Sequence, residues 1–144
     1  MRAFTVKPLW GFLIGHGIKD VENRHIAPVP PTGTAAVHIS AKYSRKDYEA
    51  DLGCVGKAMA DKLRAKLPYG ALEEMCGCVI AVVDYAVAET TASPWWDGKS
   101  KIIALSNPRW VLPCVPCKGH LGVWTLPDDI AAQVESIVNG GNGR

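Results

Sequence analysis

The feature that most constrains this chain is an apolar, helix-like segment that runs straight into a charged extended segment, within residues 7–24 (KPLWGFLIGHGIKDVENR). Pro8 favours a helix start, because its missing N–H group would be unpaired in a first turn anyway. One face of this helix is expected to carry side chains spaced by three and four positions, namely Leu9, Phe12, Leu13 and His16. Gly15 and Gly17 then end the helix, since glycine tolerates the left-handed conformation at a helix C-terminus. The pattern predicts a short helix that stops abruptly before a strand.

Five polar side chains surround Val21 after this stop, which is too polar for a strand buried on both faces: Lys19, Asp20, Glu22, Asn23 and Arg24. Side chains alternate along a strand, so Glu22 and Arg24 share one face. Lys19 belongs to the opposite face and reaches Glu22 only if the glycine turn bends the start of the strand. The sequence therefore places its best candidate chemistry at this junction.

Short extended segments separated by prolines and glycines make up much of the remaining chain. We expect strands at 4–6, 34–41, 76–89, 102–105, 110–112 and 121–126, with a bulge near Asp84 in the third of these. In the segment 34–41, apolar residues alternate with His38 and Ser40, which is typical of a strand with one face in the core. Many short strands and turns at this spacing fit a barrel.

Two further helices are expected. Ser44, followed three residues later by Asp47, resembles a capping box at the start of a helix over 44–67. Gly53 and Gly56 cost about 1 kcal/mol each relative to alanine, so this helix either runs through or divides in two. The second helix covers 127–138, and a turn is expected at Tyr69 and its neighbouring glycine. The prediction is an α+β protein with a partly open β-barrel flanked by about three helices.

Length and composition favour one domain. The chain has 144 residues, of which 48% are hydrophobic, enough for one proper core. We expect a single domain over residues 1–139 and a flexible tail over 140–144. No basic stretch followed by an apolar run stands at the N-terminus, and the longest apolar segment, around 79–88, is about half a membrane-spanning length. The expected location is the cytoplasm, with no membrane partner.

Charge and cysteines narrow the ligand classes. A formal net charge of +2 permits nucleic-acid binding without demanding it, so a basic patch has to come from arrangement. Five cysteines, an odd number without a secretion signal, predict reduced thiols. Zinc accepts the donor types of Cys76, Cys78, Cys114, Cys117 and His120, but their irregular spacing favours core thiols. We expect neither a metal nor a cofactor.

Several positions form a recognisable pattern: K-P at 7–8, Trp10, and G-x-K-x-x-E-N-R at 17–24. This pattern resembles the opening motif of the ASCH domain family, part of the PUA-like superfamily of small RNA-associated barrels. The segments HISAK at 38–42, SNPR at 106–109, PCKG at 116–119 and LGVW at 121–124 are similar to the longer bacterial and phage members. The resemblance spans about residues 4–126 and implies a PUA-like barrel.

The resemblance also implies candidate activities. One branch of ASCH proteins removes the acetyl group from acetylated cytidine, using a lysine that matches Lys19, a threonine three residues later and a distant glutamate. Glu22 occupies that threonine position here, so the hydroxyl nucleophile is missing and the mechanism does not carry over intact. A second branch is linked to RNA cleavage through a lysine for which Lys42 is the nearest match.

The candidate cleft lies between the first helix, the strand at 19–24 and the Lys42 end of the strand at 34–41. Lys19 is the candidate base and Glu22 the second acid/base, since neighbouring charges and burial shift the pKa of such groups. The alternative reading of these two residues is a surface ion-pair network. Tryptophans offer faces for base stacking, and cations meet phosphates. The other candidate binding residues are Trp10, Asn23, Arg24, His38, Ser40, Lys42, Arg109 and Lys118.

Three functions stay open at this point. The leading one is binding of RNA or a modified nucleoside in the cleft. The alternative is a hydrolase, either an amidohydrolase acting on a modified cytidine or a ribonuclease, with Lys19 and Glu22 as acid/base pair. The third is a protein-interaction module without a small ligand. The paired tryptophans at 95 and 96, in an expected loop, are better candidates for ligand contact than Trp110 and Trp124, which are expected in the core.

Overall fold

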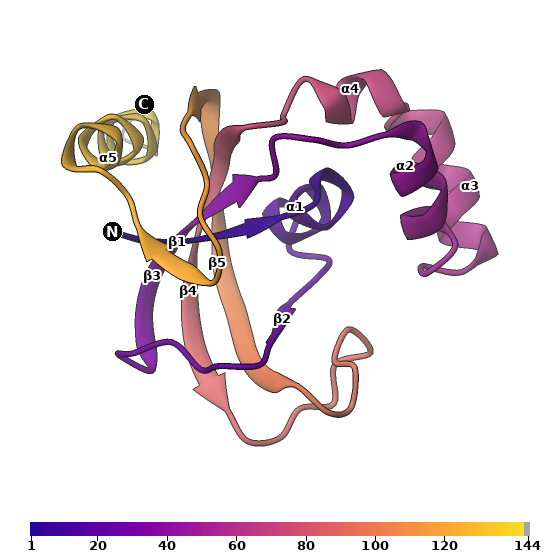
Figure 1. The fold of residues 1–144 in the computed structure, drawn as a ribbon, viewed down its shortest axis with the longest axis horizontal. Coiled ribbons are helices and arrows are strands. Elements are labelled where there is room, and N and C mark those ends of the chain that lie inside the picture. Colours follow the sequence, from indigo (N-terminus) through magenta and orange to yellow (C-terminus); the bar gives the residue numbers. More distant parts are fainter. Residues whose placement is uncertain (143–144) are drawn as a thin grey trace.

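The computed structural model describes residues 1–142 and shows a mixed α+β fold, in which a six-stranded sheet curls into half a barrel (Figure 1). The strands are β1 (Arg2–Val6), β2 (Val21–Arg24), β3 (Thr32–Ile39), β4 (Cys78–Ala88), β5 (Lys101–Pro116) and β6 (Val123–Thr125). The helices of this described range are α1 (Pro8–Gly15), α2 (Arg45–Leu52), α3 (Lys57–Lys66), α4 (Tyr69–Glu73) and α5 (Asp128–Asn142). The predicted α+β class and partly open barrel shape are confirmed at this level.

The sheet has the strand order β2-β5-β4-β3-β1-β6. β1 pairs in parallel with β3, and the other pairs are antiparallel. The β4–β5 register shifts between Val82 and Asp84, close to the predicted bulge. β2 and β6 are the two ends of this order, so the half-barrel stays open between them.

Helices cover both faces of the sheet. α1 packs inside the curl, where Ile14 joins a core with strand residues such as Val37 and Ile80 (Figure 1). α5 covers the outer face, where Val134 packs in a second core with Val82. All residues from Ala35 to Ile39 are consequently buried, so the prediction that β3 has only one core face is wrong. A third core joins α1 to α2, α3 and α4.

The segments predicted as separate strands at 102–105 and 110–112 form one 16-residue strand, β5, so this prediction is wrong. Pro108 and Pro113 were expected to break it. Both prolines fall where the pairing with β4 is irregular, and β2 pairs with β5 only over its first four residues, at 101–104. A proline is tolerated where no ladder hydrogen bond needs its N–H.

The helical predictions are confirmed in part. The capping box is present, since Asp47 N donates to Ser44 Oγ over 3.1 Å and Ser44 N donates to Asp47 Oδ2 over 3.0 Å. The helix divides between Gly53 and Gly56, where φ is +87° at Gly56. This division and α4 raise the number of helices in the described range above the expected three.

Two helix boundaries differ from prediction. α4 occupies the expected turn at 69–70, because Leu72 buries fully against α1 and the helices around it. α5 continues through Gly140 to Asn142, so this part of the predicted flexible tail is helical. The rest of that prediction, residues 143–144, lies outside the described residues.

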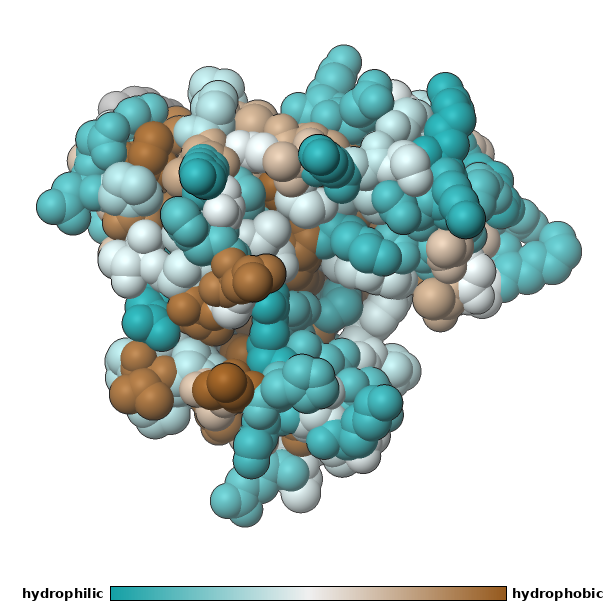
Figure 2. Space-filling model, viewed as in Figure 1, coloured by the Kyte–Doolittle hydropathy of each residue, from teal (hydrophilic) through white to brown (hydrophobic). Residues whose placement is uncertain are grey.

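Surface polarity varies over the molecule. Figure 2 shows mainly hydrophilic side chains over α2 and α3, and hydrophobic ones over the lower left, where Figure 1 places the β2–β3 connection. This connection carries the exposed Ile26 and Val29. No helix in the described range is both long and apolar enough to cross a membrane.

Candidate functional site

The turn after α1 brings Lys19 into the site. Gly17 adopts φ = +74°, and the amides of Ile18 and Lys19 both donate to the carbonyl of Leu13, over 2.9 and 3.1 Å. Lys19 therefore precedes β2 and escapes the alternation of that strand. Its side chain turns back over β2, and the residue is only 7% exposed. The bend that the sequence required for a contact between Lys19 and Glu22 is present.

Glu22 lies between two cations. Its Oε1 is 3.4 Å from Lys19 Nζ, and its Oε2 is 2.9 Å from Arg24 Nη2. Lys19 Nζ also donates to the carbonyl of Val21. The three side chains are only 8%, 12% and 20% exposed, so the group is a largely buried ion-pair cluster and not a network on the open surface.

Burial lowers the pKa of Lys19, and the charge and hydrogen bond of Glu22 oppose this shift. Arg24 lowers it further, since a neighbouring cation disfavours the ammonium form. Lys19 is therefore a lysine whose proton is held less firmly than usual, beside a carboxylate. This combination suits both hydrogen bonding to a ligand and proton transfer.

Arg24 connects the two sides of the half-barrel. Its Nη2 donates to the carbonyl of Thr5 on β1 over 3.0 Å, and its guanidinium lies 5.7 Å from the centre of the Phe4 ring. Its Nε is buried and has no hydrogen-bond partner in the described part of the chain. The strand order alone places β2 and β1 far apart, so this contact depends on the curl of the sheet.

Tryptophans form the walls of the cleft above this cluster. The cleft, which we call the tryptophan cleft, has a volume of about 630 Å³, and its lining includes Thr5, Lys7, Trp10, Lys19, Glu22, Asn23, Arg24, Cys54, Trp95, Trp96 and Asp97. Trp10 and Trp95 meet edge to face with ring centres 6.2 Å apart. The predicted members Trp10, Asn23 and Arg24 thus come together with Lys19 and Glu22.

Asn23 fixes the loop that carries Trp95. Its Nδ2 donates to the Trp95 carbonyl over 2.9 Å, and its Oδ1 accepts from the Asp97 amide over 3.2 Å. Both ends of the side-chain amide are engaged by the loop. Asn23 therefore positions a cleft wall, although the sequence suggested a direct ligand contact.

Three other predicted residues line a neighbouring cleft. This basic cleft, of about 510 Å³, is lined by Thr5, Arg24, His38, Ser40, Ala41 and residues 117–122, Lys118 among them. His38 is 1% exposed and is held between Thr5 Oγ1, at 3.1 Å from Nδ1, and the Cys117 carbonyl, at 2.6 Å from Nε2. A carbonyl only accepts, so Nε2 carries a proton. Burial lowers the pKa of His38, which favours the neutral ring.

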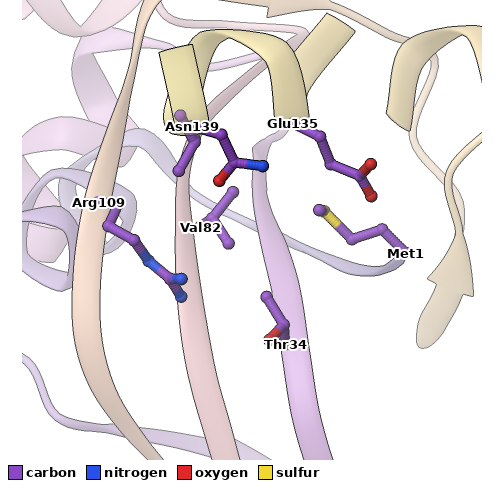
Figure 3. A pocket seen from close by; sticks show the side chains of 7 residues that line it. Met1, Thr34, Val82, Arg109, Glu135 and Asn139 are labelled. Atoms are coloured by element: carbon purple, nitrogen blue, oxygen red, sulfur yellow. The ribbon is translucent and has the colours of Figure 1, made fainter. Parts of the chain in front are cut away.

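Arg109 lies elsewhere, in a pocket of about 310 Å³ beneath α5 (Figure 3). Figure 3 shows its guanidinium reaching from β5 toward β4, beside Val82 and below Asn139 and Glu135 of α5. Arg109 Nη2 pairs with Asp84 Oδ1 over 2.7 Å. Val82 belongs to the outer core, so the sheet separates Arg109 from Lys19. Lys42 is exposed after β3 and lies outside the lining of these three cavities.

Sequence reasoning missed Thr5 and Lys7. Thr5 lines both the tryptophan cleft and the basic cleft, and its Oγ1 accepts from Trp124 Nε1 over 3.2 Å. The signal was absent because its partners lie far along the chain. Lys7 belongs to the K-P pair that carried the family resemblance, but its cleft position follows only from the placement of α1 against β1.

Metal ligation has no support in the described residues 1–142, among which no group of three or more His, Cys, Asp or Glu side chains could hold a metal ion. The five cysteines are free thiols. Burial raises the pKa of Cys78 to about 11, and a hydrogen bond with Cys114 adds to the shift. This thiol is therefore less reactive than an ordinary one.

No family model matches the chain, and a search of curated proteins finds no match. Flat aromatic walls, two buried cations and one buried carboxylate suit a planar, polar ligand.

Proposed function

We propose that the tryptophan cleft binds a nucleobase, carried by a nucleoside or by RNA. The observation that carries the proposal is that Trp10, Trp95 and Trp96 line the same cleft as the buried cluster of Lys19, Glu22 and Arg24. Stacking on an aromatic side chain contributes about 1–3 kcal/mol per base. The cluster supplies the polar contacts that stacking alone lacks.

Cytosine matches the polar cluster best. Its exocyclic amine donates and can meet the Glu22 carboxylate, as acidic side chains do with this group. The adjacent ring nitrogen and carbonyl accept and can meet Lys19. Uracil presents a carbonyl in place of the amine, which would face the carboxylate. Cytidine or a modified cytidine is therefore the preferred ligand.

The proposal includes a PUA-like barrel of the ASCH type. The curl of the sheet around α1 supports it, as does the assembly of Lys19, Glu22 and Arg24 from the motif that carries the resemblance. Glu22 in place of a threonine remains the main departure. Binding is favoured over catalysis for this reason.

A hydrolase is the second candidate, favoured by one specific observation. The pKa of Lys19 is lowered by burial while its Nζ lies 3.4 Å from Glu22 Oε1. In this reaction Glu22 would orient a water, Lys19 would take its proton, and the hydroxide would add to the acyl carbon of an acylated cytidine. As the adduct collapses, the C–N bond breaks and Lys19 returns the proton to the departing exocyclic nitrogen, which gives the acid, cytidine and Lys19 in its starting form.

Quenching of tryptophan fluorescence by cytidine and by uridine tests the binding proposal. We expect cytidine to bind more tightly, with loss of that preference in Glu22→Gln. Trp95→Ala should lose about 1–3 kcal/mol of binding free energy while keeping the main-chain bond to Asn23. Lys62→Ala, at an exposed site on α3, is the control. If neither nucleoside binds, the binding proposal fails, and a protein-interaction module without a small ligand becomes the favoured function.

Incubation with N4-acetylcytidine and with single-stranded RNA separates binding from catalysis. Product that disappears in both Lys19→Ala and Glu22→Gln would establish the hydrolase. Cytidine binding without product would leave the cleft a binding site.

A further inference from the structure

The tryptophan cleft and the basic cleft are neighbours that share two residues. Thr5 and Arg24 line both, and Arg24 Nη2 bonds to the Thr5 carbonyl at their boundary. A ligand bound in one cleft can therefore extend a neighbouring part of its structure into the other cleft. The proposed function uses only the first cleft.

The two clefts differ in charge. The tryptophan cleft contains the carboxylates of Glu22 and Asp97 beside its cations. The described lining of the basic cleft contains no carboxylate, and it contains Lys118, His120 and Arg24, whose charge is partly offset by Glu22 at 2.9 Å. An anion is therefore favoured in the basic cleft, whereas the tryptophan cleft suits a neutral polar ring.

The basic cleft is pre-organised. His38 Nε2 donates to the Cys117 carbonyl, and Cys117 N donates to the Gly77 carbonyl over 2.9 Å, which fixes the start of the segment 117–122. Gly119 packs so closely on the His38 ring that a Cβ there would lie 2.6 Å from it. Lys118 stands between these two anchored residues. Its main chain is held in place before any ligand arrives.

Arg24 has a donor that neither Thr5 nor Glu22 uses. Its Nη2 is engaged by Thr5 and Glu22, whereas its Nε is buried without a partner in the described part of the chain. A guanidinium has five N–H donors in a fixed fork, which suits a phosphate. Arg24 can hold Glu22 on one side and an anionic oxygen on the other.

We infer that the basic cleft binds the phosphate of the ligand whose base occupies the tryptophan cleft, with Arg24 and Lys118 as its cationic contacts. The ligand is then a nucleotide, free or within single-stranded RNA, and not a free nucleoside. This inference rests on the proposed function, because it takes the base to lie in the tryptophan cleft.

Calorimetric titration of the whole protein with cytidine, with its 5′- and 3′-monophosphates and with a short oligocytidylate tests the inference. We expect at least one monophosphate to bind about tenfold more tightly than cytidine, a gain of about 1.4 kcal/mol, because its phosphate adds a hydrogen bond to a charged group. Lys118→Ala should remove this gain and leave cytidine affinity unchanged. Lys62→Ala should keep it. The oligonucleotide distinguishes the sources: tighter binding than either monophosphate identifies RNA, and equal binding identifies a free nucleotide.

The outcomes separate the two proposals. Equal affinities for cytidine and both monophosphates, unaffected by Lys118→Ala, would overturn the phosphate site and leave the base site standing. Monophosphates that bind in a Lys118-dependent way, but no more tightly than inorganic phosphate and without any effect of Trp95→Ala, would overturn the base site, and the basic cleft would then be a site for phosphate alone. Absence of any binding would overturn both. For RNA, Lys118→Ala should also reduce the slope of log affinity against log salt by about 0.7, the value for one phosphate contact on a single strand.

Discussion

The side-chain amide of Asn23 donates to the main-chain carbonyl of Trp95 over 2.9 Å, so a residue of β2 holds a loop 72 positions further along the chain. Its oxygen accepts from the Asp97 amide in the same loop. The tryptophan wall is therefore attached to the strand that carries Glu22 and Arg24. The Asn23 side chain therefore fixes the position of the tryptophan loop relative to the polar cluster.

Removal of the Asn23 side-chain amide should make the loop that carries Trp95 more mobile. Asn23→Ala loses both hydrogen bonds, and we expect a loss of about 1–2 kcal/mol in the free energy of unfolding. Hydrogen exchange at the Asp97 amide should accelerate, and cytidine affinity should fall although no ligand contact is deleted. Asn139→Ala, at an exposed position on α5, is the matched control. Unchanged exchange at Asp97 would show that the loop is held by other contacts.

Substitution by alanine is expected to have opposite effects on stability at Gly15 and at Gly70. A Cβ at Gly15 would lie closer than 3.0 Å to the Trp110 ring, whereas a Cβ at Gly70 meets nothing within 4 Å. Gly15→Ala should therefore lose about 1–3 kcal/mol of stability through overpacking. Gly70→Ala in α4 should gain about 0.5–1 kcal/mol through reduced chain entropy. Urea denaturation of both variants measures the difference, and equal effects would contradict the close packing at Gly15.

Local signals predicted α1 and the α2 cap, and left open whether the helix divides at Gly53 and Gly56, because each of these features depends on residues a few positions apart. Pro8 begins α1, Ser44 caps α2, and Gly56 adopts a φ of +87° at the break, which glycine tolerates best. The continuity of β5 was not predictable in this way. Whether Pro108 breaks a strand depends on which N–H groups β2 and β4 require, and this is set by pairing with distant segments.

In the candidate site, too, contacts between residues close in sequence were predictable and contacts between distant segments were not. Lys19, Glu22 and Arg24 lie within six positions of one another, so their spacing was informative. Thr5 reaches Arg24 only because the sheet curls, which no local pattern reveals. Arg109 carries the charge expected of a phosphate contact but lies on the other face of the sheet, which depends on the register of β5.

Removal of the helix cap at Ser44 should lower the free energy of unfolding measurably. Ser44→Ala deletes the side-chain acceptor of the Asp47 amide, and we expect a loss of about 1 kcal/mol in the free energy of unfolding. Ser136→Ala, at an exposed position inside α5, should cost nothing because alanine is the better helix former. Thermal or chemical denaturation monitored by circular dichroism compares the two. Equal stability of both variants would show that α2 is held by packing alone.

The buried position of Lys19 predicts a pH dependence of stability with a defined sign. Burial lowers the pKa of Lys19 in the folded protein below its usual value of 10.5, and Glu22 opposes part of that shift. Between the lowered pKa and 10.5, the unfolded chain binds more protons at this lysine than the folded chain does. The contribution of Lys19 to the free energy of unfolding therefore rises with pH across this window. Below it, both states carry the proton, and burial of the charge costs a constant amount.

The test compares wild type with Lys19→Met by urea denaturation from neutral pH upwards. Tyrosines and cysteines titrate in the same range, so the informative quantity is the difference between the two proteins. We expect the free energy of unfolding of wild type, minus that of Lys19→Met, to increase with pH. Lys62→Met controls for the loss of one lysine at an exposed site. A difference that stays level or falls would contradict the lowered pKa of Lys19 in the folded protein, and would remove the basis for assigning it a proton-transfer role.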